Sequence, residues 1–365
     1  LAIWGCFILL SYFVMICLVN LFSRQWLYNE RMNLPLLRAP QLMEQSLDSE
    51  GLAAFFGNKF IIAGISVPVL LHLINGLNFY YPSVPQIPTI FLAGIYFSKY
   101  GLFSAFYKLK IMIYPAFIGF AFLVSKQISF SFWFFFLLGG LLIGILGVLG
   151  YNIPVGALGI TFGPTLSRPE ETQMIGAYGV FFLFIVWLAR FHLLDVVREG
   201  FGLKKNKEKE GPEWFSPALS FWGFVLGGIA IVVWCHYFGI PLLPSFLLIG
   251  AFFMVMLVAT RVICQGGVAY FTLTAAPIDG LLTCFGPRFF TGAGLLIAAV
   301  AQKVLFLDLR ESLMPSLVHA EQVTWKASNR RMVVGGVIIT LITGLAVSFA
   351  AMLALCYKFG VRELQ

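Results

Sequence analysis

Residues 261–289 read RVICQGGVAYFTLTAAPIDGLLTCFGPRF, an apolar stretch that glycine and proline interrupt. The interrupting residues are Gly266, Gly267, Pro277, Gly280, Gly286 and Pro287. Irregular backbone at membrane depth is tolerated only where it is buried in protein or lines a watery cavity. Broken helices of this kind often build the binding sites of transporters. The stretch therefore predicts a polytopic membrane protein with a candidate site near the interruption.

The composition of the chain excludes a soluble globular protein. Of the 365 residues, 60% are hydrophobic and 11% are charged, whereas soluble domains contain about 25% charged residues. The net charge is +8, but the basic residues flank apolar runs instead of gathering on one soluble face. We therefore expect the lipid bilayer, and no nucleic acid, as a partner of this chain.

Long apolar runs predict an all-α transmembrane bundle with about ten crossings. A crossing helix needs about 20 apolar residues, and the runs that meet this length are 1–22, 59–80, 129–150, 173–195, 217–238, 244–264, 288–307 and 332–357. Two less certain stretches complete the count. Residues 111–125 are short and contain Pro115, and residues 265–287 are long enough but broken.

The basic residues favour a broken crossing over a re-entrant loop for residues 265–287. If both uncertain stretches cross and the segment after the first span is cytoplasmic, most of the 24 basic residues lie inside, as the positive-inside rule requires. A re-entrant loop would move Arg310, Lys326, Arg330 and Arg331 outside. That arrangement would remove most of the bias, so we expect a broken crossing.

One hydrophilic run divides the chain. Residues 203–213 read LKKNKEKEGPE, which is typical of a solvated linker. We expect a first transmembrane bundle of about five spans at 1–202, a cytoplasmic linker at 203–216 and a second bundle at 217–365 that contains the broken span.

Three other segments are neither hydrophilic linkers nor regular spans. Residues 81–110 are rich in proline at their start, which predicts an extracytoplasmic cap with an interfacial helix. Residues 151–171 are rich in Gly and Pro yet apolar, and we expect them to fold back onto the bundle. Residues 308–326 predict a cytoplasmic amphipathic helix with Pro315 near its start and Leu313, Leu317 and Ala320 on one side.

Asp279 is the acidic residue placed deepest in apolar sequence. A carboxylate inside a membrane is costly unless it is paired or hydrated, and Arg261, Gln265 and Arg288 are the nearest candidate partners along the chain. In one interpretation Asp279 and the free backbone groups around it bind a cation or a polar solute. In the other, Asp279 caps a short helix at a structural kink.

A second polar set lies in the span 59–80. His72, Asn75 and Asn78 are spaced so that they share one helical face, and they either line a pathway or form hydrogen bonds between helices. A haem held by His72 and His236 is a further alternative. Three charged residues end the span 288–307 and either gate a cytoplasmic mouth or are ordinary charges at a span end: Asp308, Arg310 and Glu311.

No motif in the chain indicates an enzyme or a cofactor. The six cysteines form no CxxC pair and no Cys/His cluster with metal spacing, so we expect them to be small apolar side chains. No Walker loop, Rossmann fingerprint, HExxH zinc site or GxSxG elbow is present. Only Asp279 is deep, whereas an intramembrane aspartyl protease needs two facing carboxylates. We therefore predict no enzymatic activity, no cofactor and no metal.

Several short motifs resemble a known family. The first part of the chain carries RQW at 24–26, ERMNLP at 30–35, APQLME at 39–44, NGL at 75–77, YPSVP at 81–85 and SFWFF at 131–135, and the later part carries DLR at 308–310 and MP at 314–315. Together they resemble a family of large, uncharacterised bacterial polytopic membrane proteins, known only as domains of unknown function. A more distant similarity is to the oligopeptide-transporter superfamily, whose spans are also joined by a cytoplasmic segment that contains proline.

The resemblance implies further expectations. Members of the nearer family are longer and have additional N-terminal spans, so this chain, which starts inside an apolar run, resembles an N-terminally truncated member. No binding residues are established for that family, and none carry over. We expect a secondary-transporter-like protein that moves a small polar or peptide-like solute by alternating access. The candidate substrate- or ion-binding residues are Asp279, Gln265, Arg261, His72, Asn75 and Asn78.

Two other classes of function stay open. The chain is alternatively a non-catalytic structural or scaffold subunit of a larger membrane complex, with its apolar loops as partner surfaces. A homo-oligomer with a solvated central cavity would favour the transporter. The third class is a haem-bearing electron-transfer subunit.

Overall fold

The computed structural model divides the chain into two compact units. The structure describes residues 2–107, 109–151, 157–158, 165–166, 169–203, 211, 213–268, 276–306, 312–327 and 329–360. Unit 1 comprises Leu1–Met32, Leu188–Ile229 and Ser316–Gln365, and unit 2 comprises Asn33–Trp187 and Ala230–Pro315. Most of the predicted linker at 203–216 lies outside the described residues, and the predicted division into a first and a second bundle stays a prediction.

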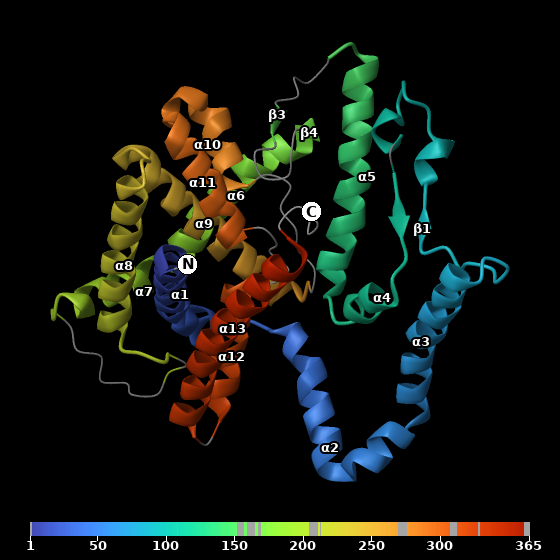
Figure 1. Cartoon of the computed structure of the whole chain (residues 1–365), viewed down its shortest axis with the longest axis horizontal. Helices are drawn as coiled ribbons and strands as arrows, with labels where there is room; N and C mark the ends of the chain where they lie inside the picture. Colours follow the sequence, from blue (N-terminus) through green and yellow to red (C-terminus); the bar gives the residue numbers. More distant parts are fainter. Residues whose placement is uncertain are drawn as a thin grey trace. The chain divides into compact units, whose positions relative to one another are not determined.

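The helices confirm an all-α fold, and their length and composition are those of an integral membrane protein. Among the described residues, six helices are long and apolar enough to cross a membrane. They are α1 Ala2–Ser23, α3 Lys59–Tyr80, α5 Lys126–Val148, α8 Pro217–Tyr237, α9 Leu242–Gly266 and α13 Arg330–Phe359 (Figure 1). Each lies in one of the runs that predict a crossing. A seventh span results if the bent pair α6 Pro169–Leu188 and α7 Arg190–Gly200 crosses as one.

Two predicted crossings correspond to shorter helices. In the run 288–307, α11 Gly292–Phe306 has 15 residues, and in the stretch 111–125, α4 Pro115–Ala121 has 7 residues. At 1.5 Å per residue, α4 is about 10 Å long, whereas the hydrocarbon core of a bilayer is about 30 Å thick. Helix α4 alone is therefore too short to cross, and both the crossing at 111–125 and the total of ten crossings stay predictions.

Residues 81–110 form turns and a strand where an interfacial helix is predicted. Strand β1 Ile90–Phe91 pairs antiparallel with β2 Ile111–Met112, and the 3-10 turns η3 Ala93–Tyr96 and η4 Ser104–Phe106 lie between the two strands. The prolines before β1 account for the difference, because proline lacks an N–H group and holds the preceding residue in extended backbone.

Shorter elements connect the long helices. The π-helix η1 Arg24–Asn29 continues α1, and the other connecting elements are η2 Pro35–Leu37, α2 Arg38–Gly57, α10 Pro277–Phe285, η5 Pro287–Phe289 and α12 Leu313–Lys326. The helix predicted within 308–326 is therefore present as α12. In the loop 151–171, β3 Ala157–Leu158 pairs antiparallel with β4 Thr165–Leu166, and most of that loop lies outside the described residues.

In unit 1, α1 and α8 approach closely because two glycines face α1. A β carbon at Gly223 would lie 2.6 Å from Cys17 Sγ, and one at Gly227 would lie 2.5 Å from Val14 Cγ2. Both distances are shorter than van der Waals contact, so no larger residue fits there without movement. The spacing of four residues is the small-xxx-small pattern that brings transmembrane helices together.

In unit 2, α9 is the central helix and glycine ends it. Most side chains between Leu248 and Cys264 are buried. Gly267 follows α9 in the left-handed conformation, with a φ of 69°, and its backbone N–H donates to the Ile263 carbonyl, which is a common way to end a helix. A β carbon at Gly267 would also lie 2.8 Å from Pro35 Cβ. The predicted interruption after residue 265 thus begins at a glycine that both space and conformation require.

The helix resumes at α10, which packs against α9 and α11. Gly286, with a φ of 78°, ends α10. Residues 269–275, between α9 and α10, lie outside the described residues. The structure describes the end of α9 and the start of α10 on either side of these residues. The broken crossing at 265–287 itself stays a prediction.

The close approach of α1 and α8 predicts a difference between two neighbouring glycines. Gly227→Ala should lower the free energy of unfolding by about 1–3 kcal/mol, because the added methyl group overlaps Val14. Gly228→Ala is the matched control, since a β carbon at Gly228 has no atom within 4 Å. It should be neutral or slightly stabilising, because alanine favours a helix more than glycine does. Thermal unfolding of both variants in one detergent checks this, and equal midpoints would contradict the α1–α8 packing.

Candidate functional site

Asp279 is buried in the first turn of α10, where only 2% of its surface is exposed. Its Oδ2 accepts a hydrogen bond from the Ala276 backbone N–H at 3.3 Å. On α11, Gln302 Oε1 accepts a hydrogen bond from the Ile278 backbone N–H at 2.8 Å. Both N–H groups belong to the start of a helix, where the backbone has no intrahelical acceptor, and a negative charge there is also favoured by the helix dipole. The described geometry of Asp279 is thus that of a helix cap, and a binding role stays a prediction.

The structure brings Arg261 and Gln265 together at the end of α9. Arg261 Nε donates a hydrogen bond to Gln265 Oε1 at 2.9 Å, as expected for residues one helical turn apart. Arg261 is buried and Gln265 is exposed. This polar pair lies in unit 2 with Asp279 and marks the last turn before the interruption.

The polar face of α3 holds the segment that follows the helix. Asn75 donates to the Ile87 carbonyl at 3.0 Å and accepts from the Ile87 N–H at 2.8 Å, and Asn78 donates to the Val84 carbonyl at 2.6 Å. His72 on the same face is exposed. Within the described part of the chain, these three side chains share no hydrogen bond with Asp279. Their contribution to a pathway therefore stays a prediction, whereas their contact with the proline-rich segment is observed.

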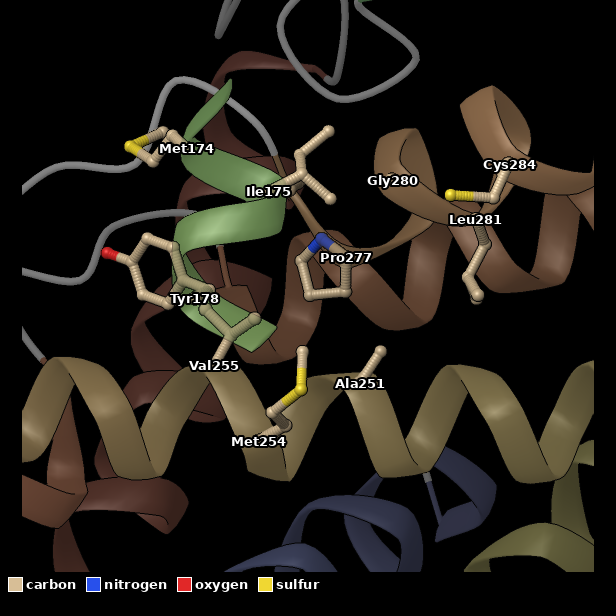
Figure 2. Close-up of a pocket in the computed structure, with 11 residues that line it drawn as sticks. Met174, Ile175, Tyr178, Ala251, Met254, Val255, Pro277, Gly280, Leu281 and Cys284 are labelled. Atoms are coloured by element: carbon tan, nitrogen blue, oxygen red, sulfur yellow. The ribbon is translucent and has the colours of Figure 1, made fainter. Parts of the chain in front are cut away.

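A small pocket in unit 2 lies beside α10. Its volume is about 130 Å³, and it is lined by Met174, Ile175 and Tyr178 of α6, by Ala251, Met254 and Val255 of α9, and by Ala276, Pro277, Gly280, Leu281 and Cys284 around α10. Figure 2 shows the Tyr178 hydroxyl turned away from Pro277, so the surfaces that face the pocket are apolar. Asp279 is not among the lining residues. This pocket suits an apolar group and not a polar solute.

Unit 1 contains a second concentration of polar groups, at the end of α1. Asn20 is 2% exposed and uses its full hydrogen-bonding capacity. Its Oδ1 accepts from the backbone N–H groups of Trp214 at 2.6 Å and Phe215 at 3.2 Å. Its Nδ2 donates to the Phe215 carbonyl at 3.0 Å and to Ser220 Oγ at 2.6 Å. One amide side chain of α1 therefore fixes the segment that enters α8.

Charged groups surround this anchor. Arg24 lies 3.7 Å from Glu213, and both side chains are nearly buried. Arg330, at the start of α13, donates from Nη1 to the Gly211 carbonyl at 2.8 Å. His192 of α7 lies 2.9 Å from the Leu21 carbonyl through Nε2. The end of α1 thus contacts α7, the segment before α8 and, through that segment, α13.

Glu321 of α12 completes this group and is 1% exposed. It hydrogen-bonds with Ser23 at the end of α1. Burial raises the pKa of Glu321 well above its ordinary value; the hydrogen bond with Ser23 and the Arg330 guanidinium oppose this increase, and the Glu213 carboxylate adds to it. We name the group of these six residues the α1 polar cluster: Asn20, Ser23, Arg24, Glu213, Glu321 and Arg330.

Sequence reasoning missed Glu321, although its spacing carries a signal. The buried residues of α12 are Met314, Pro315, Leu317, Val318, Glu321 and Thr324. Residues three and four apart share a helix face, so Glu321 follows Leu317 and Val318 on the apolar side. A glutamate at such a position is rare unless it is paired or protonated. The predicted face of Leu313, Leu317 and Ala320 therefore differs from the buried face. Leu317 is buried, whereas Leu313 and Ala320 are only partly buried.

The other predicted groups are the cysteines, His236 and the charged residues at 308–311. All six cysteines are free. His236 lies 3.1 Å from the Ile240 carbonyl. Within the described ranges, no group of three or more His, Cys, Asp and Glu side chains is arranged to hold a metal ion. Asp308, Arg310 and Glu311 lie outside the described residues.

The hydrogen bonds of Asn20 predict a large stability effect. Asn20→Leu should lower the free energy of unfolding by at least about 2 kcal/mol, because it leaves buried backbone groups of Trp214 and Phe215 without partners. Ser11→Ala is the control, since Ser11 is equally buried but donates only to the Phe7 carbonyl of its own helix. Thermal unfolding in detergent measures both. An Asn20→Leu variant as stable as Ser11→Ala would show that this anchor does not hold unit 1.

Comparison with known proteins places the chain in one family. A family model described as "Family of unknown function (DUF6785)" matches residues 1–365. Comparison with curated proteins and with solved structures finds no match. The match covers the whole chain and agrees with the expected membership in an uncharacterised family. The chain therefore belongs to this family of unknown function.

Proposed function

We propose that the protein is a secondary-transporter-like membrane protein that moves a small polar or peptide-like solute by alternating access. The observation that supports this proposal most is the interruption between α9 and α10. The first turn of α10 is buried, and it holds an acidic side chain. Transporter sites are commonly formed where helices break inside the bundle, because free backbone groups and charges are available there.

The caps of α10 suggest how such a site would work. Asp279 and Gln302 provide the oxygen atoms that accept the first N–H groups of α10. A cation or proton that binds the Asp279 carboxylate would compete with its hydrogen bond to Ala276. Binding would then loosen the start of α10, and release would restore it. In this mechanism Arg261 and Gln265 border the same interruption at the end of α9, and His72, Asn75 and Asn78 border the pathway from α3.

The proposal includes a topology. About ten crossings would lie in a bacterial inner membrane, with the linker 203–216 in the cytoplasm and residues 81–110 outside. No enzymatic step and no cofactor is proposed. The distant similarity to the oligopeptide-transporter superfamily belongs to this proposal as well.

A scaffold role is the second candidate, and one observation favours it. In the spans of α3 and α13, no residue of the most apolar window is buried. Large apolar side chains of these helices are exposed, among them Phe60, Leu73, Ile339 and Met352. Either lipid or another protein covers such surfaces. A stoichiometric partner that co-purifies after mild detergent extraction would favour the scaffold, and a homogeneous preparation of this chain alone would favour the transporter.

Transport in proteoliposomes tests the proposed function. The probes are mixtures of radiolabelled amino acids and of di- and tripeptides, offered with and without an inward proton gradient. Asp279→Asn should lower the uptake of the transported probe by at least about tenfold, because a charge-assisted interaction of about 1.5–3 kcal/mol is lost. The variant keeps an oxygen atom that caps α10, so its fold should persist.

Asp48→Asn is the matched control, since Asp48 is exposed on α2. It should transport as the unmodified protein does. Uptake that Asp279→Asn leaves unchanged for every transported probe would remove Asp279 from the mechanism. The absence of uptake of any probe by the unmodified protein would count against the transporter and for the scaffold.

A further inference from the structure

We infer that Glu321 is a proton-binding site, protonated in the structure described, which releases its proton to loosen the segment before α8 from the end of α1. The site lies in unit 1 and is distinct from Asp279 in unit 2. The inference goes beyond the proposed transport function and does not depend on it. It rests on three observations: the burial of Glu321, its buried Oε2 without a hydrogen-bond partner among the described residues, and the arrangement of the surrounding charges.

The burial of Glu321 makes an isolated negative charge unfavourable. The side chain is 1% exposed on the apolar side of α12, and within the described residues it has no ion pair. Its Oε2 is buried without a hydrogen-bond partner there. An ionised carboxylate in such surroundings costs several kcal/mol, whereas a protonated one is neutral.

Ser23 offers an ionised Glu321 little support. Ser23 Oγ donates to the Asn20 carbonyl at 3.0 Å, and a hydroxyl group has only one hydrogen to donate. The hydrogen bond between Ser23 and Glu321 lowers the pKa of Glu321, but it does not cancel the increase that burial causes.

The charged neighbours of Glu321 have partners of their own, although Arg330 Nη2 is buried without a hydrogen-bond partner among the described residues. Arg24 pairs with Glu213 at 3.7 Å, and Arg330 donates to the Gly211 carbonyl at 2.8 Å. Of the groups that act on Glu321 from neighbouring elements, Arg330 is the cation and Glu213 is the anion. His319 is a further titratable group on α12. A charge on Glu321 would be opposed by Glu213, and it would compete with Glu213 and the Gly211 carbonyl for Arg24 and Arg330.

Loss of the proton therefore acts on the segment that holds Gly211 and Glu213. This segment is fixed to α1 by the Arg24–Glu213 ion pair and by the hydrogen bonds of Asn20 to Trp214 and Phe215. Repulsion between Glu321 and Glu213 would weaken the ion pair first. The proton on Glu321 thus controls how tightly the end of α1 binds the start of α8.

The effect of pH on stability has a defined sign. Because the pKa of Glu321 is raised in the folded protein, the folded state binds this proton more tightly than the unfolded state does. The contribution of this proton to the free energy of unfolding is fully present below the ordinary pKa of glutamate, about 4.3. It is lost as the pH rises through the raised pKa of the folded protein.

Infrared spectroscopy of the purified protein tests the protonation directly. The C=O stretching band of a protonated carboxyl group should persist well above the ordinary pKa of glutamate, and Glu321→Gln should remove it. Glu44→Gln, at an exposed glutamate of α2, should leave it. A spectrum that Glu321→Gln does not change would overturn the inference.

A second variant keeps the test decisive if Glu321→Gln does not fold. Ser23→Ala removes a hydrogen bond that lowers the pKa of Glu321, so it should raise the pH at which the infrared band disappears. A band whose pH dependence Ser23→Ala leaves unchanged would overturn the inference.

Thermal unfolding from about pH 4 to about pH 9 gives an independent readout. The midpoint of the unmodified protein should fall as the pH rises through the raised pKa of Glu321, and Glu321→Gln should reduce this fall. Glu44→Gln should follow the unmodified protein. An unchanged pH dependence in Glu321→Gln would contradict the inference. None of these measurements involves a solute, so a failure of transport and a failure of the proton site are distinguishable.

Discussion

The structure of unit 1 depends on the need of buried polar groups for partners at the end of an apolar helix. Asn20 lies in an otherwise apolar span and can be buried only because Trp214, Phe215 and Ser220 satisfy all its hydrogen bonds. Glycines at the facing positions of α8 let that helix come close enough for these bonds to form. Ser23 and Arg24, one turn further, bring Glu321 and Glu213 to the same place. Packing and polar pairing therefore act on the same pair of helices.

Unit 2 meets the same constraint differently, because its polar groups are the ends of a broken helix. Gly267 ends α9, and the oxygen atoms of Asp279 and Gln302 cap the start of α10. The pocket beside α10 is lined by apolar groups, and Asp279, Arg261 and Gln265 are not among its lining residues. A cation or proton at Asp279 would act on the helix cap, and the pocket would accept only an apolar group. Among the described residues, each unit thus contains one buried carboxyl group with a distinct set of partners.

The sequence predicts the long helices because about 20 consecutive apolar residues have few other structures available in a membrane. It does not predict the secondary structure of residues 111–125 or 81–110, because short apolar runs fit a strand, a turn or a helix equally well. At the candidate sites, the pattern points to Asp279 because it is alone in apolar sequence. Glu321 is harder to recognise, because α12 is short and its buried face is known only once its partners are known. The partners of Asn20 lie about 195 residues away, and no local pattern reveals them.

The central claim is that the proton on Glu321 and the hydrogen bonds of Asn20 act together to hold the segment before α8. Hydrogen–deuterium exchange of the Trp214 and Phe215 amides tests it most directly, because both amides donate to Asn20. After correction for the intrinsic pH dependence of exchange, their protection should fall as the pH rises in the unmodified protein and stay constant in Glu321→Gln. Equal protection at every pH in the unmodified protein, or the same fall in both proteins, would contradict the account.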